Sequence, residues 1–401
     1  MGKPEIRFKG YTDEWEQRKL GELVGIYDGV HQTPDYQDSG IMFLSVENIA
    51  TLKSEKYISE EAFERDYKVY PEKGDILMTR IGDVGTTNVV ETAEKVAFYV
   101  SLALLKPNGI DSYFLSNAMK TNAFQKGLRE RTLVTAIPQK INKDEIGKID
   151  IFITNNDEEQ KKIGAYFSNL DHLITLHQRK CDEVKCLKKY MLQKMFPQNE
   201  QKVPEIRFEG FTEAWEQRKL EECLSEITYG FTNPMSDTEE GPWKITAKDI
   251  LDGMINYSSA RHTSQIEYDD LTNKSKPLVG DLLLTKDGTL GRTAIVDAEN
   301  VCINQSVALL RFNEKCSVQY AKTLLDTPMY QKQMLDDAGG GTIKHIYITK
   351  VDKMFISVPC MKEQERLVLF FNNLDNLITL HQQKCEELKK IKKFMLQKMF
   401  V

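Results

Sequence analysis

Apolar positions repeat with helical spacing in two long stretches of the chain. From about Asp157 to Phe196, apolar or weakly polar residues alternate at intervals of four and three, at Ile163, Phe167, Leu170, Ile174, His177, Cys181 and Val184. The same alternation returns from about Lys362 to Phe400, at Leu367, Phe371, Leu374, Ile378, His381, Cys385 and Leu388. Such spacing turns one narrow seam toward a partner helix, so each stretch is predicted to be one helix of a coiled coil.

Beyond this seam the spacing drifts, to Leu187, Met191 and Met195 in the first stretch and to Ile391, Met395 and Met399 in the second. At about 1.5 Å per residue, some 39 helical residues span roughly 58 Å, which suits a rod that separates two parts. Asn156 is a candidate N-cap, with Glu159 three residues later, and Pro197 ends the first helix. We expect the two helices to pair antiparallel, because they are equally long.

The middle of each helix carries a His-x-x-x-Cys pair, His177 with Cys181 and His381 with Cys385. The i, i+4 spacing puts both side chains on one helical face, and antiparallel pairing would bring the two pairs together. Four such side chains could hold zinc. The alternative is that they are small or weakly polar seam residues that set the register. We favour the second interpretation and predict no metal site.

An internal duplication relates the two halves of the chain. Residues 4–20 return as residues 204–220, identical at 13 of 17 positions, and residues 170–196 return as 374–400, identical at 20 of 27. The regions between, roughly 21–153 and 221–358, are much less alike. Segments that pack against each other keep their sequence, whereas surfaces with different tasks diverge. The halves therefore resemble two readers on one frame.

Short apolar strands and glycine loops still match between the divergent bodies. Gly74-Asp-Ile-Leu-Met-Thr-Arg corresponds to Gly280-Asp-Leu-Leu-Leu-Thr-Lys, and Ser101-Leu-Ala-Leu-Leu to Ser306-Val-Ala-Leu-Leu. Amphipathic helices are predicted from Tyr113 to Leu128 and from Val318 to Leu335. The fold class is thus α/β: two tandem mixed α/β domains and two long helices that form an antiparallel coiled coil, related by a pseudo-twofold. The predicted boundaries are 1–153 and 198–358 for the domains, and 154–197 and 359–401 for the helices.

Composition excludes several classes of protein. The chain has 401 residues, 41% hydrophobic and 28% charged, as expected of a globular protein with two or three domains. It contains neither a run of 18 apolar residues nor an apolar signal core, so we expect a cytoplasmic protein without membrane contact. The seven cysteines lack a Cys-x-x-Cys pair and are typical of reduced thiols. A net charge of −6 argues mildly against coating nucleic acid, but leaves room for local basic loops.

No constellation for catalysis is evident. The loops at Gly82 to Gly85 and Gly288 to Gly291 lack the spacing of a phosphate-binding fingerprint, and we interpret them as tight turns. Asn233-Pro-Met-Ser partly resembles the base-gripping loop of amino-methyltransferases, although a turn is the simpler interpretation. We therefore expect a chain that neither cleaves nor methylates DNA alone.

Candidate DNA contacts lie in the divergent loops, because Arg, Lys, Asn, Gln and Thr can bind base edges or phosphates. Taken singly, each fits an ordinary solvated side chain better than a DNA contact. Their recurrence on matching loops selects Gln32, Thr33, Arg80, Thr86, Asn88, Arg129, Arg131, Lys140, Asn233, Lys248, Lys286, Arg292, Thr342, Lys344 and His345. His31, Thr87, Lys126 and Thr232 lie beside them, and three glycines from Gly339 would allow close backbone approach.

The chain as a whole resembles the specificity subunit of type I restriction-modification enzymes. The likeness rests on Trp-Glu-Gln-Arg-Lys-Leu at Trp15 and Trp215, on the Gly-Asp-Ile-Leu and Gly-Asp-Leu-Leu strands, and on Glu-Gln before Leu-Asp-x-Leu-Ile-Thr-Leu-His-Gln. The first helix departs from the family's usual Pro before Glu-Gln, with Asn155-Asn156-Asp157 instead.

This resemblance implies a non-catalytic subunit in which each body reads one half of a split double-stranded DNA target. The paired helices would act as a ruler and dock two methyltransferase subunits, to which restriction subunits attach. S-adenosylmethionine, ATP and Mg²⁺ would be bound by those partners. The alternative is a coiled-coil assembly scaffold with two protein-binding modules, and salt-dependent DNA affinity would distinguish the two.

Overall fold

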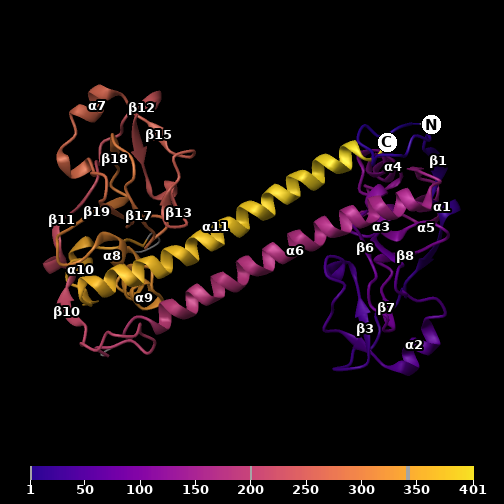
Figure 1. Ribbon diagram of the computed structural model, residues 1–401, viewed down its shortest axis with the longest axis horizontal. Coiled ribbons are helices and arrows are strands. Elements are labelled where there is room, and N and C mark those ends of the chain that lie inside the picture. Colours follow the sequence, from indigo (N-terminus) through magenta and orange to yellow (C-terminus); the bar gives the residue numbers. More distant parts are fainter. Residues whose placement is uncertain (1, 199–200, 340–343) are drawn as a thin grey trace. The chain divides into compact units, whose positions relative to one another are not determined.

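The chain forms two compact units. The computed structural model describes residues 2–198, 201–339 and 344–401. One unit comprises Met1–Arg179 with Gln382–Val401, and the other comprises Lys180–His381 (Figure 1). Each unit contains one divergent body and parts of both long helices, α6 (Asp157–Lys194) and α11 (Met361–Lys398). The duplication seen in the sequence is thus matched by a similar arrangement within the two units.

Two small sheets build the body of the first unit. The four-stranded sheet has the order β2-β8-β5-β6, with strands Val24–Asp28, Leu102–Pro107, Ile76–Thr79 and Thr87–Val89, all antiparallel to their neighbours. The three-stranded sheet has the order β4-β3-β7, with Tyr57–Ile58, Ile41–Leu44 and Val96–Phe98, and β3 runs parallel to β7. Strand β1 (Glu16–Lys19) pairs with β9 (Asp150–Ile153). The predicted mixed α/β class is confirmed.

Strand β5 reads as a continuous apolar run because both of its faces are covered. Ile76 and Met78 face a core built around Trp15, which packs edge-on against Phe114 and Phe400. Leu77, between them, belongs to a second core on the opposite face. The helices of this unit's body are α1 (Leu20–Leu23), α2 (Glu60–Asp66), α3 (Ser112–Ala118), α4 (Asn122–Arg131) and α5 (Lys143–Gly147).

The second unit repeats this plan. Its four-stranded sheet has the order β11-β19-β16-β17, with Leu224–Tyr229, Val307–Phe312, Leu282–Thr285 and Thr293–Ile295. Its three-stranded sheet has the order β15-β12-β18, with Arg261–His262, Thr238–Ile245 and Val301–Ile303. Strands β13 (Ile250–Leu251) and β14 (Met254–Ile255) form a hairpin, and β10 (Glu216–Lys219) pairs with β20 (Phe355–Val358). Its helices are α7 (Gln265–Asp269), α8 (Val318–Leu325), α9 (Pro328–Asp336) and α10 (Ile348–Val351).

The two amphipathic stretches predicted as helices are each broken into two. In the first unit α3 ends at Ala118, and the Thr121 hydroxyl accepts a hydrogen bond from the Phe124 amide to start α4. In the second unit Pro328 is the first residue of α9, a position where its missing N–H costs nothing. Continuous helices were wrong at these points because local capping residues interrupt an otherwise regular apolar period.

Helices α6 and α11 begin and end within two residues of the predicted positions. In the first unit the Cys385 thiol donates to the Ile174 carbonyl at 3.9 Å, and in the second the Cys181 thiol donates to the Ile378 carbonyl at 4.0 Å. Rising numbers in α6 thus face falling numbers in α11, so the antiparallel pairing is confirmed. The finer expectation, that the two His-x-x-x-Cys pairs lie together, concerns contacts between residues of different units. It stays a prediction.

The seam departs from the prediction beyond Val184 and Leu388. Leu187 is 41% exposed and Ile391 is 36% exposed, so neither belongs to the seam. Lysines take the inward positions instead: the Lys188 ammonium lies 2.6 Å from Asp375, and the Lys392 ammonium lies 2.5 Å from Asp171. A lysine can occupy such a position because its stem covers apolar surface while its ammonium reaches an acid on the facing helix. In this part of the helices, ion pairs between the two helices rather than hydrophobic spacing determine which residues face the partner.

Candidate nucleic-acid interface

A buried Arg–Glu ion pair fastens the opening segment of each unit to the start of its long helix. Arg7 binds Glu159 through two bonds of 2.5 and 2.8 Å, and Arg207 binds Glu363 through two bonds of 2.8 Å. Asn156 is the N-cap, as predicted, since its side-chain oxygen accepts the Glu159 amide at 3.1 Å. The Glu159 carboxylate, however, serves Arg7 rather than the helix start, and this hydrogen bonding raises the pKa of Arg7.

The glutamine that follows each of these glutamates joins the helix to the body. Gln160 accepts a hydrogen bond from the Asp111 amide at 3.0 Å and donates one to the Thr154 carbonyl at 2.7 Å. Gln364 accepts from the Ser317 amide at 2.9 Å in the same way. The Glu-Gln pairs that mark both halves of the sequence therefore hold a common frame. Such a frame presents the divergent loops from equivalent places in both units.

The basic residues at the ends of β5 and β16 occupy matching positions, as predicted. The Arg80 amide donates to the Ser101 carbonyl and the Lys286 amide to the Ser306 carbonyl, both at 2.9 Å. Neither side chain is freely solvated: the Arg80 side chain is 8% exposed and the Lys286 side chain 16% exposed. Burial lowers the pKa of Arg80.

The partners of these two residues differ at one matched position. Asp28 pairs with Ala103 on the neighbouring strand, and Tyr229 pairs with the corresponding Ala308. In the first unit Asp28 forms an ion pair with Arg80. In the second unit the Lys286 ammonium lies 5.3 Å from the centre of the Tyr229 ring and 2.8 Å from Asp287. The same scaffold thus presents two different polar arrangements.

A neighbouring segment brings one further predicted residue to each site. The Arg80 carbonyl accepts the Ile141 amide at 3.0 Å, next to the exposed Lys140, and the Lys286 carbonyl accepts the Ile346 amide at 2.9 Å, next to His345. His345 lies 2.6 Å from Asp287 through its Nδ1 atom. Burial raises the pKa of Asp287, but hydrogen bonds from Lys286 and His345 outweigh it and hold the pKa below its usual range. Thr342, predicted on this segment, lies outside the described residues.

The glycine loops are tight turns, as interpreted from the sequence. Gly82, Gly85, Gly288 and Gly291 have φ values of 81°, 103°, 78° and 79°, which glycine adopts without strain. Beyond these turns, Asn88 donates to the Ile49 carbonyl at 3.0 Å, and Arg292 donates to the Ile250 carbonyl at 3.1 Å. Thr86 donates to Asp83 at 2.7 Å. These side chains therefore also position neighbouring loops.

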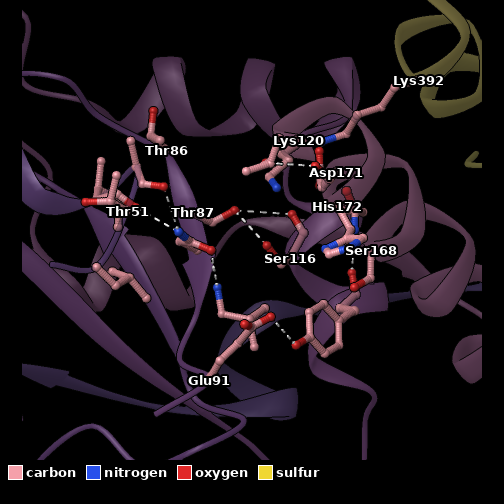
Figure 2. Close-up of a pocket in the computed structure, with 18 of the residues that line it drawn as sticks. Thr51, Thr86, Thr87, Glu91, Ser116, Lys120, Ser168, Asp171, His172 and Lys392 are labelled. Atoms are coloured by element: carbon pink, nitrogen blue, oxygen red, sulfur yellow. Dashed lines mark hydrogen bonds and ion pairs between the residues drawn. The ribbon is translucent and has the colours of Figure 1, made fainter. Parts of the chain in front are cut away.

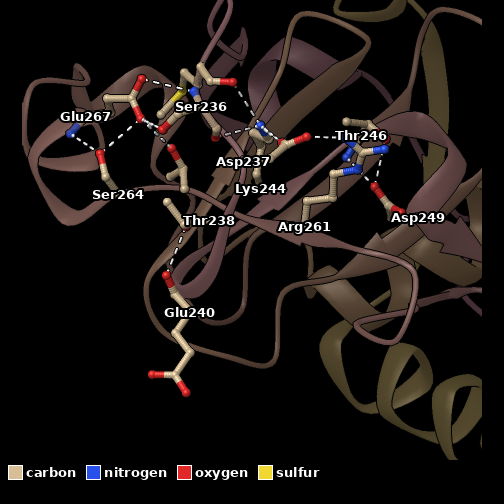
Figure 3. Close-up of polar contacts among 12 residues, drawn as sticks. Ser236, Asp237, Thr238, Glu240, Lys244, Thr246, Asp249, Arg261, Ser264 and Glu267 are labelled. Atoms are coloured by element: carbon tan, nitrogen blue, oxygen red, sulfur yellow. Dashed lines mark hydrogen bonds and ion pairs between the residues drawn. The ribbon is translucent and has the colours of Figure 1, made fainter.

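The loop that carries Asn233 is held by hydrogen bonds and ion pairs with residues that lie up to 31 positions away in the chain. Figure 3 shows Ser236 turned toward Glu267 and Asp237 between Lys244 and Arg261. The Ser236 amide donates to Glu267 at 3.0 Å, and hydrogen bonds from Ser236 lower the pKa of Glu267 to about 2. Sequence reasoning missed these anchors, because no regular spacing relates them. The exposed Asn233 therefore lies on a loop held at one end.

The remaining predicted residues are not gathered by the contacts above. Gln32, Thr33, Arg129, Lys248 and Lys344 are exposed, whereas Arg131 is half-buried and donates to the Gly127 carbonyl at 3.4 Å. Their role in DNA binding stays a prediction. Among residues 2–198, 201–339 and 344–401, no three His, Cys, Asp or Glu side chains converge as metal ligands. Over the same ranges, no helix is long and apolar enough to cross a membrane.

Comparison with known proteins places these features in one family. The profile described as "Type I restriction modification DNA specificity domain" matches residues 12–186 and again residues 215–390. The chain is 24% identical over 402 residues to the MjaX type I restriction enzyme specificity subunit of Methanocaldococcus jannaschii, covering 95% of this chain and 91% of that protein. It is 20% identical to the MjaVIII specificity subunit of the same organism, with the same coverage.

Solved structures show the same fold. The type I restriction-modification S subunit from M. genitalium superposes with a TM-score of 0.67 at 14% identity, covering 100% of this chain and 99% of that one. A chain from a structure described as the basis of complex assembly and conformational transition of the type I restriction-modification system gives a TM-score of 0.53 at 15% identity. It covers 96% of this chain and 97% of that chain.

Proposed function

Because the chain belongs to the type I restriction-modification specificity family and is a specificity subunit with two recognition domains, we propose that each domain reads one half of a split double-stranded DNA target. The long helices set the spacing of the two halves and dock two methyltransferase subunits. Restriction subunits join through that complex. The chain itself contributes recognition, while S-adenosylmethionine, ATP and Mg²⁺ are bound by the partner subunits.

One observation carries this proposal: the two units share a frame but present different groups from it. Arg7–Glu159 and Arg207–Glu363 are equivalent ion pairs, whereas Asp28 and Tyr229 differ at one matched position beside a basic residue that both units share. Direct readout of base edges depends on which donors and acceptors a loop presents. Two units with the same frame but different loops are therefore expected to recognise two different half-sites.

The test exchanges one body within the assembled enzyme. Residues 221–358 are replaced by the equivalent body of a relative, and methylated adenines are mapped in the genome of the host cell by long-read sequencing. We expect one half of the recognised site to change and the other half to persist. The reciprocal exchange of residues 21–153 is the matched control and should change the opposite half. Simultaneous change of both halves in either exchange would contradict the division of labour.

Two further measurements address the remaining parts of the proposal. Removing one heptad from both long helices should alter the spacer of the target and leave its two half-sites unchanged, since the seam repeats every seven residues. The complex with methyltransferase subunits should bind duplex DNA with an affinity that falls steeply as salt rises. Salt-independent capture of proteins, without DNA affinity, would favour the scaffold alternative. Methylation by the purified chain alone would show that it carries chemistry of its own.

A further inference from the structure

The first unit contains a polar cavity of about 860 Å³ between its recognition body and the two long helices. Thr51 and Thr86 lie on one side of it, and Ser168 and His172 of α6 lie on the other (Figure 2). Its volume falls within the range of sites for small ligands. The cavity is unrelated to the anchored loop of Figure 3, but its lining includes Thr86 and Asn88, two of the predicted DNA contacts.

One matched position in this space differs between the two units. The N-caps Asp111 and Ser317 and the glutamines Gln125 and Gln331 make equivalent bonds, which aligns α3 with α8 and pairs Ser116 with Lys322. In the second unit the Lys322 side chain extends into this region, and its ammonium would lie 2.8 Å from a Cβ on Gly253. In the first unit the short Ser116 instead bonds Thr87 at 2.9 Å. The serine therefore leaves room where the second unit has a lysine.

The charges at the matched positions are also reversed. In the second unit Asp326 accepts hydrogen bonds from Lys322 at 3.1 Å and from Thr293 at 2.6 Å, so it is neutralised locally. The first unit has Lys120 in place of Asp326. The nearby Asp171 carboxylate is already bound by Lys392 at 2.5 Å. Among the described residues, the Lys120 ammonium has no hydrogen bond or ion pair of its own.

The lining of the cavity therefore has a net excess of one positive charge. Its lining contains three lysines against two carboxylates, and Figure 2 shows Lys120 and Lys392 gathered beside Asp171. A half-enclosed ammonium is costly when the carboxylate that attracts it, Asp171, is already bound by another lysine. A charge-assisted hydrogen bond to an oxyanion contributes about 1.5–3 kcal/mol. The cavity is larger than a bare ion requires, which leaves room for an attached organic group.

We propose that this cavity is a binding site for a small oxyanion, of the phosphate or carboxylate type, held by Lys120 and supported by Lys392. Ser168 and His172 line the same side and offer further hydrogen bonds. The second unit lacks the site, because Lys322 occupies the space and Asp326 reverses the charge. The two units therefore differ in this site, and only the first unit has a place for the ligand.

Proton linkage gives the site a signature. Burial and repulsion by Lys392 outweigh the attraction of Asp171 and lower the pKa of Lys120 to about 8. Anion affinity should therefore be full below pH 8 and fall as the pH rises through that value, because the neutral amine offers no charge. The titratable and charged groups that share the cavity with Lys120 are Lys53, Glu91, Tyr113, Asp171, His172 and Lys392.

The test is calorimetric titration of the full chain with inorganic phosphate, adenosine monophosphate and citrate. We expect saturable binding of at least one probe, weakened at least about tenfold in Lys120→Gln. The double substitution Ser116→Lys with Lys120→Asp copies the arrangement that the second unit already tolerates, and should abolish binding. The reciprocal Lys322→Ser with Asp326→Lys should create a second site. The exposed Lys143, substituted by Gln, is the matched control and should leave binding unchanged.

Three outcomes would overturn the proposal. The first is the absence of saturable binding by any of the probes at pH 7. The second is equal affinity in the wild type and in Lys120→Gln, with both folded by circular dichroism. The third is that Lys120→Gln weakens binding to duplex DNA or to a methyltransferase subunit, while no small anion binds the wild type. Each outcome is independent of the body-exchange test, so failure of this site would leave the proposed recognition function standing.

Discussion

Removing the guanidinium of Arg7 should destabilise the first unit selectively. The Glu159 side chain is fully buried and the Arg7 side chain is 11% exposed, so Arg7→Met leaves a carboxylate in the interior without its partner. Breaking such a pair from one side costs about 3–5 kcal/mol, whereas replacing both members by apolar residues is often close to neutral. We therefore expect Arg7→Met to lose about 3–5 kcal/mol, and Arg7→Met with Glu159→Met to recover most of it.

The assay is hydrogen exchange as a function of urea, read by mass spectrometry on peptides from each unit. Protection should fall in residues 1–179 and 382–401 for Arg7→Met, and in residues 180–381 for the matched variant Arg207→Met. Arg18→Met, which removes an exposed pair with Glu22, should leave the transition unchanged. If the double variant is as unstable as Arg7→Met alone, the cost does not come from an unpaired buried carboxylate and the reasoning is refuted.

Three further predictions concern the anchored loop, the helix pair and the chain ends. Because hydrogen bonds from Ser236 lower the pKa of Glu267 to about 2, this anchor is fully present above the usual glutamate pKa, about 4.3, and is lost as the pH falls toward 2. Amide exchange at Ser236 should accelerate over that range, and Glu267→Gln should remove the dependence. Ile174→Cys should form a disulfide with the native Cys385 under oxidation, and failure to crosslink would contradict the antiparallel pairing within the first unit. Joining the termini and opening the chain within residues 197–204 should preserve folding, and circular dichroism would reveal a loss.

The last of these predictions follows from a repeated junction. In the second unit the Ile206 amide donates to the Lys194 carbonyl at 2.9 Å, along a chain that continues from helix to opening segment. In the first unit the Ile6 amide donates to the Lys398 carbonyl at 2.8 Å, although these residues belong to opposite ends of the chain. Equivalent contacts with and without a covalent connection indicate that the connection is dispensable for folding.

Sequence patterning was most informative where one periodic feature is repeated. The two helices, their seam as far as Val184 and Leu388, and the apolar strands were all predicted, because each depends on spacing along a single segment. The candidate interface was predicted less completely. The matched positions of Arg80 and Lys286 followed from their neighbours in sequence, but their burial did not. Asp28 and Tyr229 lie more than 50 residues away from them in the chain, so no local pattern links them.

The sequence by itself determined that this protein is a duplicated α/β chain with two coiled-coil helices and a family likeness that extends over both halves. These properties are encoded in period, identity and order, all of which are readable along one dimension. Only the tertiary structure decided that Glu159 pairs with Arg7. It also decided that Ser116 borders a cavity in the first unit, where the matched Lys322 of the second unit reaches Gly253. The physical reason is that ion pairs and cavities depend on which side chains meet in space, and the residues that meet here are separated by long intervals of chain.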